Sequence, residues 1–219
     1  MRYIRKGQEP QRLLEYRLTP HATYEGLPQD VKDELRERLA REQGFLCCYC
    51  MQRITPEPDG MKIEHWASQS HHGDRQLDWK NLLGACKGGK GAPQAEQHCD
   101  THKGNTDITV NPTEQRCERF VRFLPDGTVE SDDPAVQTDM GQTLNLNYAR
   151  LKNNRKAVLD AFREFLQRKY SGTTWSKEAL ERELTELQRP NGSGLLREYC
   201  QVPIYWLEKR MGRLGQTRP

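Results

Sequence analysis

Apolar residues recur at helical spacing near the start of the chain. Residues 27–30, Leu-Pro-Gln-Asp, are typical of a helix start, and every fourth residue from Val31 to Leu39 is then apolar. Gly44 is suited to end this helix because glycine tolerates the left-handed conformation of a helix terminus. The preceding residues are polar and basic with little periodicity. We therefore predict an N-terminal arm and one amphipathic helix over residues 1–44.

Helical spacing returns in the last third of the chain. We expect one long helix from about Asn145 to Gly172, a second from about Ser176 to Gln188, and a third after Pro203. Between the two helical regions, residues 117–123 and 128–131 flank an Asp-Gly turn and predict a β-hairpin. Residues 111–219 should therefore form this hairpin plus a mostly helical C-terminal lobe.

The composition fits a polar protein that acts away from membranes. Of the 219 residues, 34% are hydrophobic and 30% are charged, and there is no run of 18 apolar residues. No apolar stretch follows the first charged residues, so a secretory signal is not expected and the location should be cytoplasmic. In that reducing compartment, the seven cysteines are better metal ligands or buried thiols than disulfide partners. The net charge of +3 is too small to identify a nucleic-acid binder.

Residues 45–110 hold five of the seven cysteines and five of the six histidines. Cys47 and Cys50 have the C-x-x-C spacing that lets two thiolates of one turn bind zinc, with Cys86 and Cys99 as further ligands. A structural Zn²⁺ site of four cysteines is the prediction. The sequence leaves three alternative ligands open. Cys48 is adjacent to Cys47 and could replace it, and two histidines close to Cys99 could replace that residue. These alternative ligands are Cys48, His98 and His102.

Polar residues that suit phosphate chemistry lie around this cysteine set. Glu64-His65 pairs a carboxylate with an imidazole in a predicted strand, which places the two side chains on opposite faces. Asn81 precedes a short apolar strand and can clamp a loop through its amide. Asp100 follows a predicted zinc ligand and can reach back toward Glu64. Taken alone, a Glu-His pair is commonly solvated surface.

A glycine-rich loop at residues 84–91 nearly matches a nucleotide-binding loop. Gly91 stands where that motif needs a hydroxyl side chain, so nucleotide binding is not predicted. A basic loop beside a nucleic-acid backbone is the preferred interpretation, with Lys87, Lys90 and Lys103 as the lysines that contact phosphates.

The ordered set C-x-x-C, Glu-His, Asn-Leu, Cys and Cys-Asp-x-x-Lys-Gly resembles the HNH endonuclease family, which has the ββα-metal fold. The resemblance is densest over residues 44–111 and is carried by 44–50, 63–66, 79–82 and 98–104. More narrowly, these segments look like the HNH subunit of Septu-type antiphage systems, the PtuB-like family that also occurs beside retrons. The resemblance implies an α+β fold with a ββα-metal (HNH) nuclease core over residues 45–110.

Each site residue takes a role from this resemblance. His65 matches the general base, Glu64 matches a ligand of the catalytic metal, and Asn81 matches the residue that orients the loop bearing the base. Asp100 stands where the wider family commonly has His or Asn, and its oxygens suit Mg²⁺ or Mn²⁺. The long insert between Cys86 and Cys99 is a larger departure from the family pattern.

The resemblance also implies a biological setting. The protein would be a phosphodiester hydrolase, with DNA as the default substrate and RNA such as tRNA as the other possibility. It would be the effector of an antiphage complex whose partners are a PtuA-like ABC-type ATPase and, in some systems, a retron reverse transcriptase with its DNA. The competing interpretation is a non-catalytic zinc-knuckle subunit that binds nucleic acid or protein.

Overall fold

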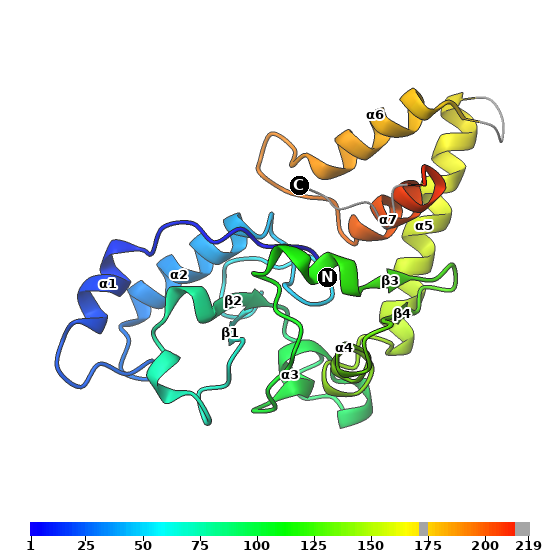
Figure 1. The fold of residues 1–219 in the computed structure, drawn as a ribbon. Helices are drawn as coiled ribbons and strands as arrows, with labels where there is room; N and C mark the ends of the chain where they lie inside the picture. Colours follow the sequence, from blue (N-terminus) through cyan, green and yellow to red (C-terminus); the bar gives the residue numbers. More distant parts are fainter. Residues whose placement is uncertain (171–174, 213–219) are drawn as a thin grey trace.

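The computed structural model describes residues 1–170 and 175–212, and it mixes helices with two small sheets (Figure 1). The α-helices are α1 (Gln11–Arg17), α2 (Gln29–Glu42), α3 (Cys99–Lys103), α4 (Pro134–Thr138), α5 (Ala149–Tyr170), α6 (Lys177–Gln188) and α7 (Gln201–Arg210). The strands are β1 (Lys62–His65), β2 (Leu82–Ala85), β3 (Arg122–Phe123) and β4 (Val129–Glu130). Short 3₁₀ helices cover Gly73–Arg75, Trp79–Asn81, Gln94–Glu96 and Gln115–Phe120, and a π-helical turn covers Asp139–Thr143.

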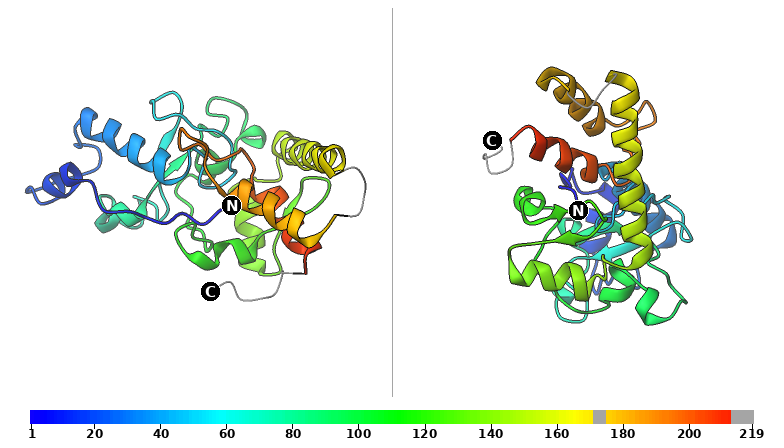
Figure 2. Two further views of the ribbon diagram at one scale, coloured as in Figure 1. Left: turned by 90° about the horizontal axis from the view of Figure 1, so that it is seen from above. Right: turned by 90° about the vertical axis from the view of Figure 1, so that its right-hand side faces the viewer.

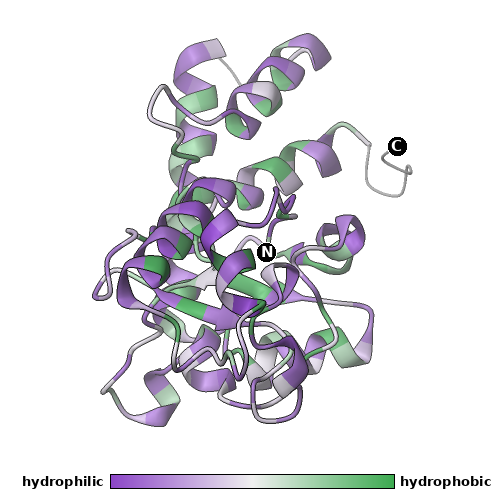
Figure 3. Ribbon diagram, turned by 90° about the vertical axis from the view of Figure 1, so that its left-hand side faces the viewer, coloured by the Kyte–Doolittle hydropathy of each residue, from purple (hydrophilic) through white to green (hydrophobic). Residues whose placement is uncertain are grey.

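The elements are arranged with helices at both ends of the molecule. Helices α1 and α2 lie at one end, and α5, α6 and α7 lie at the other, in both the front view and the view from above (Figures 1 and 2). Strands β1 and β2 pair antiparallel between these ends, with Glu64 opposite Leu83 and His65 opposite Leu82. Buried side chains from all three predicted segments join one continuous cluster. Hydrophobic and hydrophilic residues alternate along the helices (Figure 3). The helices and the two small sheets together confirm the expected mixed α and β architecture.

Helix α2 packs on the sheet that carries Glu64 and His65. Its predicted apolar face, Val31 to Leu39, is buried. Just past its end, Gln43 donates one amide hydrogen bond to Leu46 O and another to Gly84 O, both at 2.7 Å, and accepts one from Gly84 N at 2.6 Å. Because the side chain of Gln43 is itself buried, these bonds fix the end of α2 against β2 and the cysteine turn that follows.

Two predictions about the first half of the chain and the hairpin need correction. Residues 11–17 form helix α1, which was not expected because only Leu13 is buried and so short a helix shows no periodicity. The hairpin is shorter than predicted, since only Arg122–Phe123 pairs with Val129–Glu130 and Cys117 lies in a 3₁₀ helix.

The C-terminal helices largely follow the predictions. Helix α5 begins at Ala149 instead of Asn145, because Asn145 has a φ of +46°, which no residue inside a right-handed helix adopts. The predicted end at Gly172 lies outside the described residues. Helices α6 and α7 occupy the predicted ranges, although α7 begins at Gln201, ahead of Pro203. Among the residues that the structure describes, no helix combines the length and the apolar character that crossing a membrane requires.

A buried arginine holds the hairpin turn against α5. Arg155, 1% exposed, donates to Gly127 O at 2.6 Å and to Leu146 O at 2.7 Å. An Arg155→Met substitution is expected to lower the free energy of unfolding by about 2 to 4 kcal/mol, because it leaves two buried carbonyls unpaired. Urea unfolding measures this change. Arg163→Met on the exposed face of α5 is the control, and an equal loss in both variants would contradict the assignment.

Candidate functional site

Four cysteines converge in the core beside the β1–β2 sheet. The Sγ atoms of Cys47, Cys50, Cys86 and Cys99 all lie within 4.8 Å of one another, and all four residues are buried. The Cys50–Cys86 and Cys47–Cys99 sulfur pairs are 3.8 and 3.9 Å apart. Sulfurs bound tetrahedrally to zinc at about 2.3 Å lie about 3.8 Å from one another. The cluster therefore fits a four-thiolate zinc site.

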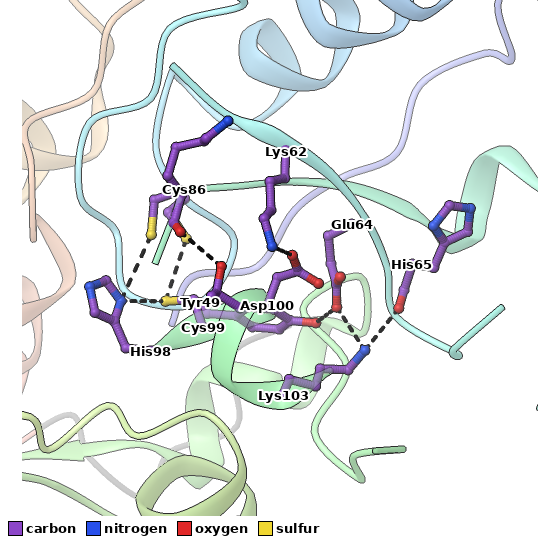
Figure 4. A network of polar contacts seen from close by, with 12 residues as sticks. Tyr49, Lys62, Glu64, His65, Cys86, His98, Cys99, Asp100 and Lys103 are labelled. Carbon is purple, nitrogen blue, oxygen red and sulfur yellow. Dashed lines mark hydrogen bonds and ion pairs between the residues drawn. The ribbon is translucent and has the colours of Figure 1, made fainter. Parts of the chain in front are cut away.

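The alternative ligands lie outside this set of four. Cys48 is buried, but its thiol is not one of the converging sulfurs. His102 places Nδ1 3.0 Å from Thr143 O. His98 comes nearest, with Nδ1 3.3 Å from the sulfur of Cys99 (Figure 4). This geometry places the His98 ring beside the Cys99 thiol, and the four cysteines would complete a tetrahedral site without it.

Local hydrogen bonds shape the turn that brings the first two ligands together. Cys47 N donates to Gln52 O at 2.8 Å, and Met51 N donates back to Cys47 O at 3.0 Å. Cys48 N donates to Gly84 O at 3.0 Å, which ties the turn to β2. A Cβ at Gly84 would lie 2.8 to 3.1 Å from the side-chain ends of Met61, Ile54 and Gln43, all buried, so a larger residue would require these side chains to shift. The end of β2 then delivers Cys86, directly after Ala85, to the same cluster.

Helix α3 connects the cysteine cluster with the acidic residues. Its first residue is Cys99 of the cysteine cluster, Asp100 follows, and Lys103 lies one turn further on the same short helix. The Nζ of Lys103 pairs with Glu64 Oε1 at 2.8 Å and donates to His65 O at 3.0 Å (Figure 4). The side chain of Lys103 is 1% exposed. The expectation that Lys103 is a surface side chain is therefore wrong, because its ammonium is enclosed between the carboxylate of Glu64 and the carbonyl oxygen of His65.

Two carboxylates meet in this buried region. Glu64 is 2% exposed and accepts a hydrogen bond of 2.7 Å from the hydroxyl of Tyr49. Burial, followed by the hydrogen bond and charge of Asp100, raises the pKa of Glu64 well above its usual value. Burial acts in the same direction on Asp100, but the hydrogen bond with Glu64 and the ion pair with Lys62 lower its pKa overall. The Nζ of Lys62 donates a hydrogen bond of 2.6 Å to Oδ2 of Asp100.

The geometry of His65 defines which ring nitrogen is free. Its Nε2 lies 2.9 Å from the carbonyl oxygen of Gln76, which only accepts hydrogen bonds, so Nε2 carries the proton and Nδ1 keeps a lone pair. Burial lowers the pKa of His65, and the hydrogen bond to Gln76 opposes this only in part. The ring of Tyr24 packs edge-on against the imidazole at 4.6 Å. His65 is thus a neutral, oriented imidazole at neutral pH.

Asn81 clamps the loop that follows His65. Its amide nitrogen donates to Ala67 O at 3.0 Å and to Arg75 O at 3.1 Å, and its oxygen accepts from Ala67 N at 2.8 Å. Asn81 is fully buried, so these bonds have no competition from water. They join the two ends of the loop that runs from His65 to Gln76.

The predicted site residues open onto one pocket of about 390 Å³. Glu64, His65 and Asp100 line it, together with the predicted lysines Lys87 and Lys90. Asn81 and the four cysteines are buried and are not among the lining residues. Four lining or supporting residues escaped the sequence analysis: Tyr24, Arg36, Tyr49 and Lys62. Strand alternation places Lys62 on the same face as Glu64 and was the available signal for it.

Comparison with known proteins adds two relatives, although no protein-family model matches the sequence. A protein of Escherichia coli named "Retron Ec83 putative HNH endonuclease" is 25% identical over 207 residues, which cover 74% of this chain and 80% of that protein. The Septu protein PtuB of Bacillus thuringiensis is 26% identical over 118 residues, 52% of this chain and 42% of PtuB. These relatives confirm the resemblance to the HNH proteins of Septu and retron systems.

Proposed function

We propose that this protein is a metal-dependent HNH endonuclease that hydrolyses phosphodiester bonds in nucleic acid. The observation that carries the proposal is one pocket that is lined both by His65, an oriented neutral imidazole, and by the carboxylates of Glu64 and Asp100. Strand β1 supplies Glu64 and His65, its partner β2 follows, and helix α3 supplies Asp100, an element order that supports a ββα-metal core. The names of the two relatives support the same activity.

The two carboxylates fit a hard divalent cation. Glu64 and Asp100 line the same pocket, and carboxylate oxygens are ligands that Mg²⁺ and Mn²⁺ prefer. In the free protein these two carboxylates pair with Lys62 and Lys103, so a bound cation would compete with the two ammonium groups for their oxygens. When bound there, the cation would neutralise charge on the scissile phosphate and on the leaving oxygen.

Other side chains of the protein carry out proton transfer, substrate binding and positioning. The lone pair on Nδ1 of His65 takes the proton of the attacking water, while Gln76 O holds the ring by its other nitrogen. Lys87 and Lys90 line the same pocket and attract the phosphate backbone. Tyr49, which lies within the cysteine turn, orients Glu64 through its hydroxyl. The four-cysteine zinc site has every position filled by protein, so its role is structural.

The biological role is inferred from the relatives and from the sequence pattern. We place the protein in the cytoplasm as the nuclease of an antiphage complex, with a PtuA-like ABC-type ATPase as partner and, in a retron setting, a reverse transcriptase with its DNA. DNA is the default substrate, and tRNA is the alternative. Supporting this setting, the relatives are named as proteins of a retron and of a Septu system.

A cleavage assay tests the proposed activity. The purified protein, alone and with the ATPase, is incubated with plasmid DNA and with total tRNA in Mg²⁺, in Mn²⁺ and in EDTA. We expect cleavage of one substrate that requires the divalent cation. Absence of cation-dependent cleavage in every combination would favour the non-catalytic zinc-knuckle subunit instead.

Loss of the Asn81 clamp is expected to slow cleavage without removing zinc. An Asn81→Ala substitution frees the carbonyls of Ala67 and Arg75, so the loop that holds the His65 ring loses its fixed shape. We expect a decrease of at least about tenfold in the cleavage rate and faster amide hydrogen exchange over residues 66–76. Asn153→Ala on the exposed face of α5 is the control. An unchanged rate together with a loosened loop would contradict the positioning role.

A further inference from the structure

Each carboxylate of the pocket already has a lysine partner. Lys62 pairs with Asp100 at 2.6 Å, and Lys103 pairs with Glu64 at 2.8 Å. Both pairs are shielded from water, since their four side chains are between 1% and 27% exposed. The formal charges of these four groups cancel. The free protein therefore presents a carboxylate pair whose negative charge has been neutralised by its own side chains.

The rest of the pocket adds positive charge. Arg36, Lys87 and Lys90 also line it, and Glu64 and Asp100 are the acidic residues among its lining. Asp33, which pairs with Arg36 at 2.6 Å, is half exposed and lies outside the lining. A divalent cation that entered this pocket alone would find both carboxylates already paired with lysines and further cationic side chains around them, so its net electrostatic attraction would be small. A phosphodiester carries the negative charge that the pocket lacks.

We propose that the divalent cation and the substrate phosphate bind this pocket cooperatively, because Lys62 and Lys103 neutralise its carboxylates in the free protein. This inference rests on the proposed function, in which Glu64 and Asp100 hold the cation. The nucleic acid completes the cation site, and by thermodynamic reciprocity the cation tightens binding of the nucleic acid by the same factor. The free protein therefore holds catalytic metal weakly, and the site assembles only on substrate.

Binding of Mn²⁺ tests the proposal without relying on turnover. Zinc-loaded His65→Ala protein, which is not expected to cleave, is titrated with Mn²⁺ and followed by electron paramagnetic resonance, with and without a short DNA duplex. Total tRNA replaces the duplex if tRNA is the substrate. The double variant His65→Ala, Asp100→Asn is the background control, because it reports only the Mn²⁺ that binds to the nucleic acid and to other sites of the protein. We expect the nucleic acid to tighten Mn²⁺ binding at the Asp100 site by at least about tenfold.

A variant of Lys62 tests whether pairing with lysine weakens cation binding to the free protein. Lys62→Met in the same background is expected to tighten Mn²⁺ binding to the free protein by about tenfold and to reduce the effect of the nucleic acid. Lys156→Met, which removes a Lys–Asp pair on α5 away from the pocket, is the matched control. Equal Mn²⁺ affinity with and without nucleic acid would overturn the inference even if Lys62→Met did not fold. Mn²⁺ binding that Asp100→Asn leaves unchanged would instead overturn the proposed metal site itself.

Discussion

Replacing His65 with alanine is expected to lower the rate of nucleic-acid cleavage by a factor of about 100 to 10,000. The imidazole is held by Gln76 O and by the edge of Tyr24, with Nδ1 as the nitrogen that can accept a proton. Alanine removes this base but leaves the contacts of Glu64 with Tyr49 and Lys103 in place. Single-turnover cleavage in saturating Mn²⁺ measures the chemical step without the contribution of product release.

The His65→Ala substitution is expected to slow the chemical step without affecting folding. Zinc content and the thermal unfolding midpoint should therefore stay close to those of the wild type. His21→Asn is the matched control, because His21 is exposed and has a φ of +61°, which asparagine tolerates. A His65→Ala protein that cleaves as fast as the wild type would show that another group takes the proton of the water.

Replacing Cys50 with serine is expected to remove the bound zinc and with it the catalytic centre. Four thiolates bind zinc with apparent free energies on the order of 10 kcal/mol, and in a small module this energy stabilises the fold. Loss of one ligand also frees Cys99, whose helix carries Asp100 and Lys103. We expect less than one zinc per chain by elemental analysis, a lower unfolding midpoint, and loss of cleavage.

The neighbouring cysteine provides a stringent control. Cys48 is as buried as Cys50, but its sulfur lies outside the cluster of four. A Cys48→Ser protein should therefore keep one zinc per chain, although burial of the new hydroxyl will cost some stability. Retention of zinc by Cys50→Ser together with its loss from Cys48→Ser would reverse the ligand assignment.

The features that can be predicted from the sequence are those that depend on residues close together in the chain. The apolar spacing from Val31 to Leu39 predicts α2 because one face of a helix must be buried. The spacing of Cys47 and Cys50 predicts a metal turn for a similar reason, since two ligands of one turn need no information from elsewhere. The cysteine cluster needs two distant thiols as well, and the sequence names Cys86 and Cys99 for them but leaves Cys48, His98 and His102 open as alternative ligands.

The features that escaped the sequence depend on contacts between distant residues. A lysine next to a glycine indicates exposed surface, yet Lys103 is enclosed because α3 places it against Glu64, 39 positions earlier in the chain. Arg36 belongs to the helix preceding the proposed nuclease core and still lines the pocket. Arg155 occupies an apolar helix face because two distant carbonyls accept its hydrogen bonds. No local pattern encodes these partners.

The most direct test of the account compares wild-type, His65→Ala and Glu64→Gln proteins in one cleavage assay with Mg²⁺ or Mn²⁺ and the partner ATPase present. Glu64→Gln keeps an acceptor for Tyr49 while removing the carboxylate from the pocket. We predict cation-dependent cleavage by the wild type and cleavage at least about 100-fold slower by both variants. Equal cleavage by all three zinc-loaded proteins would contradict a catalytic centre built on Glu64 and His65.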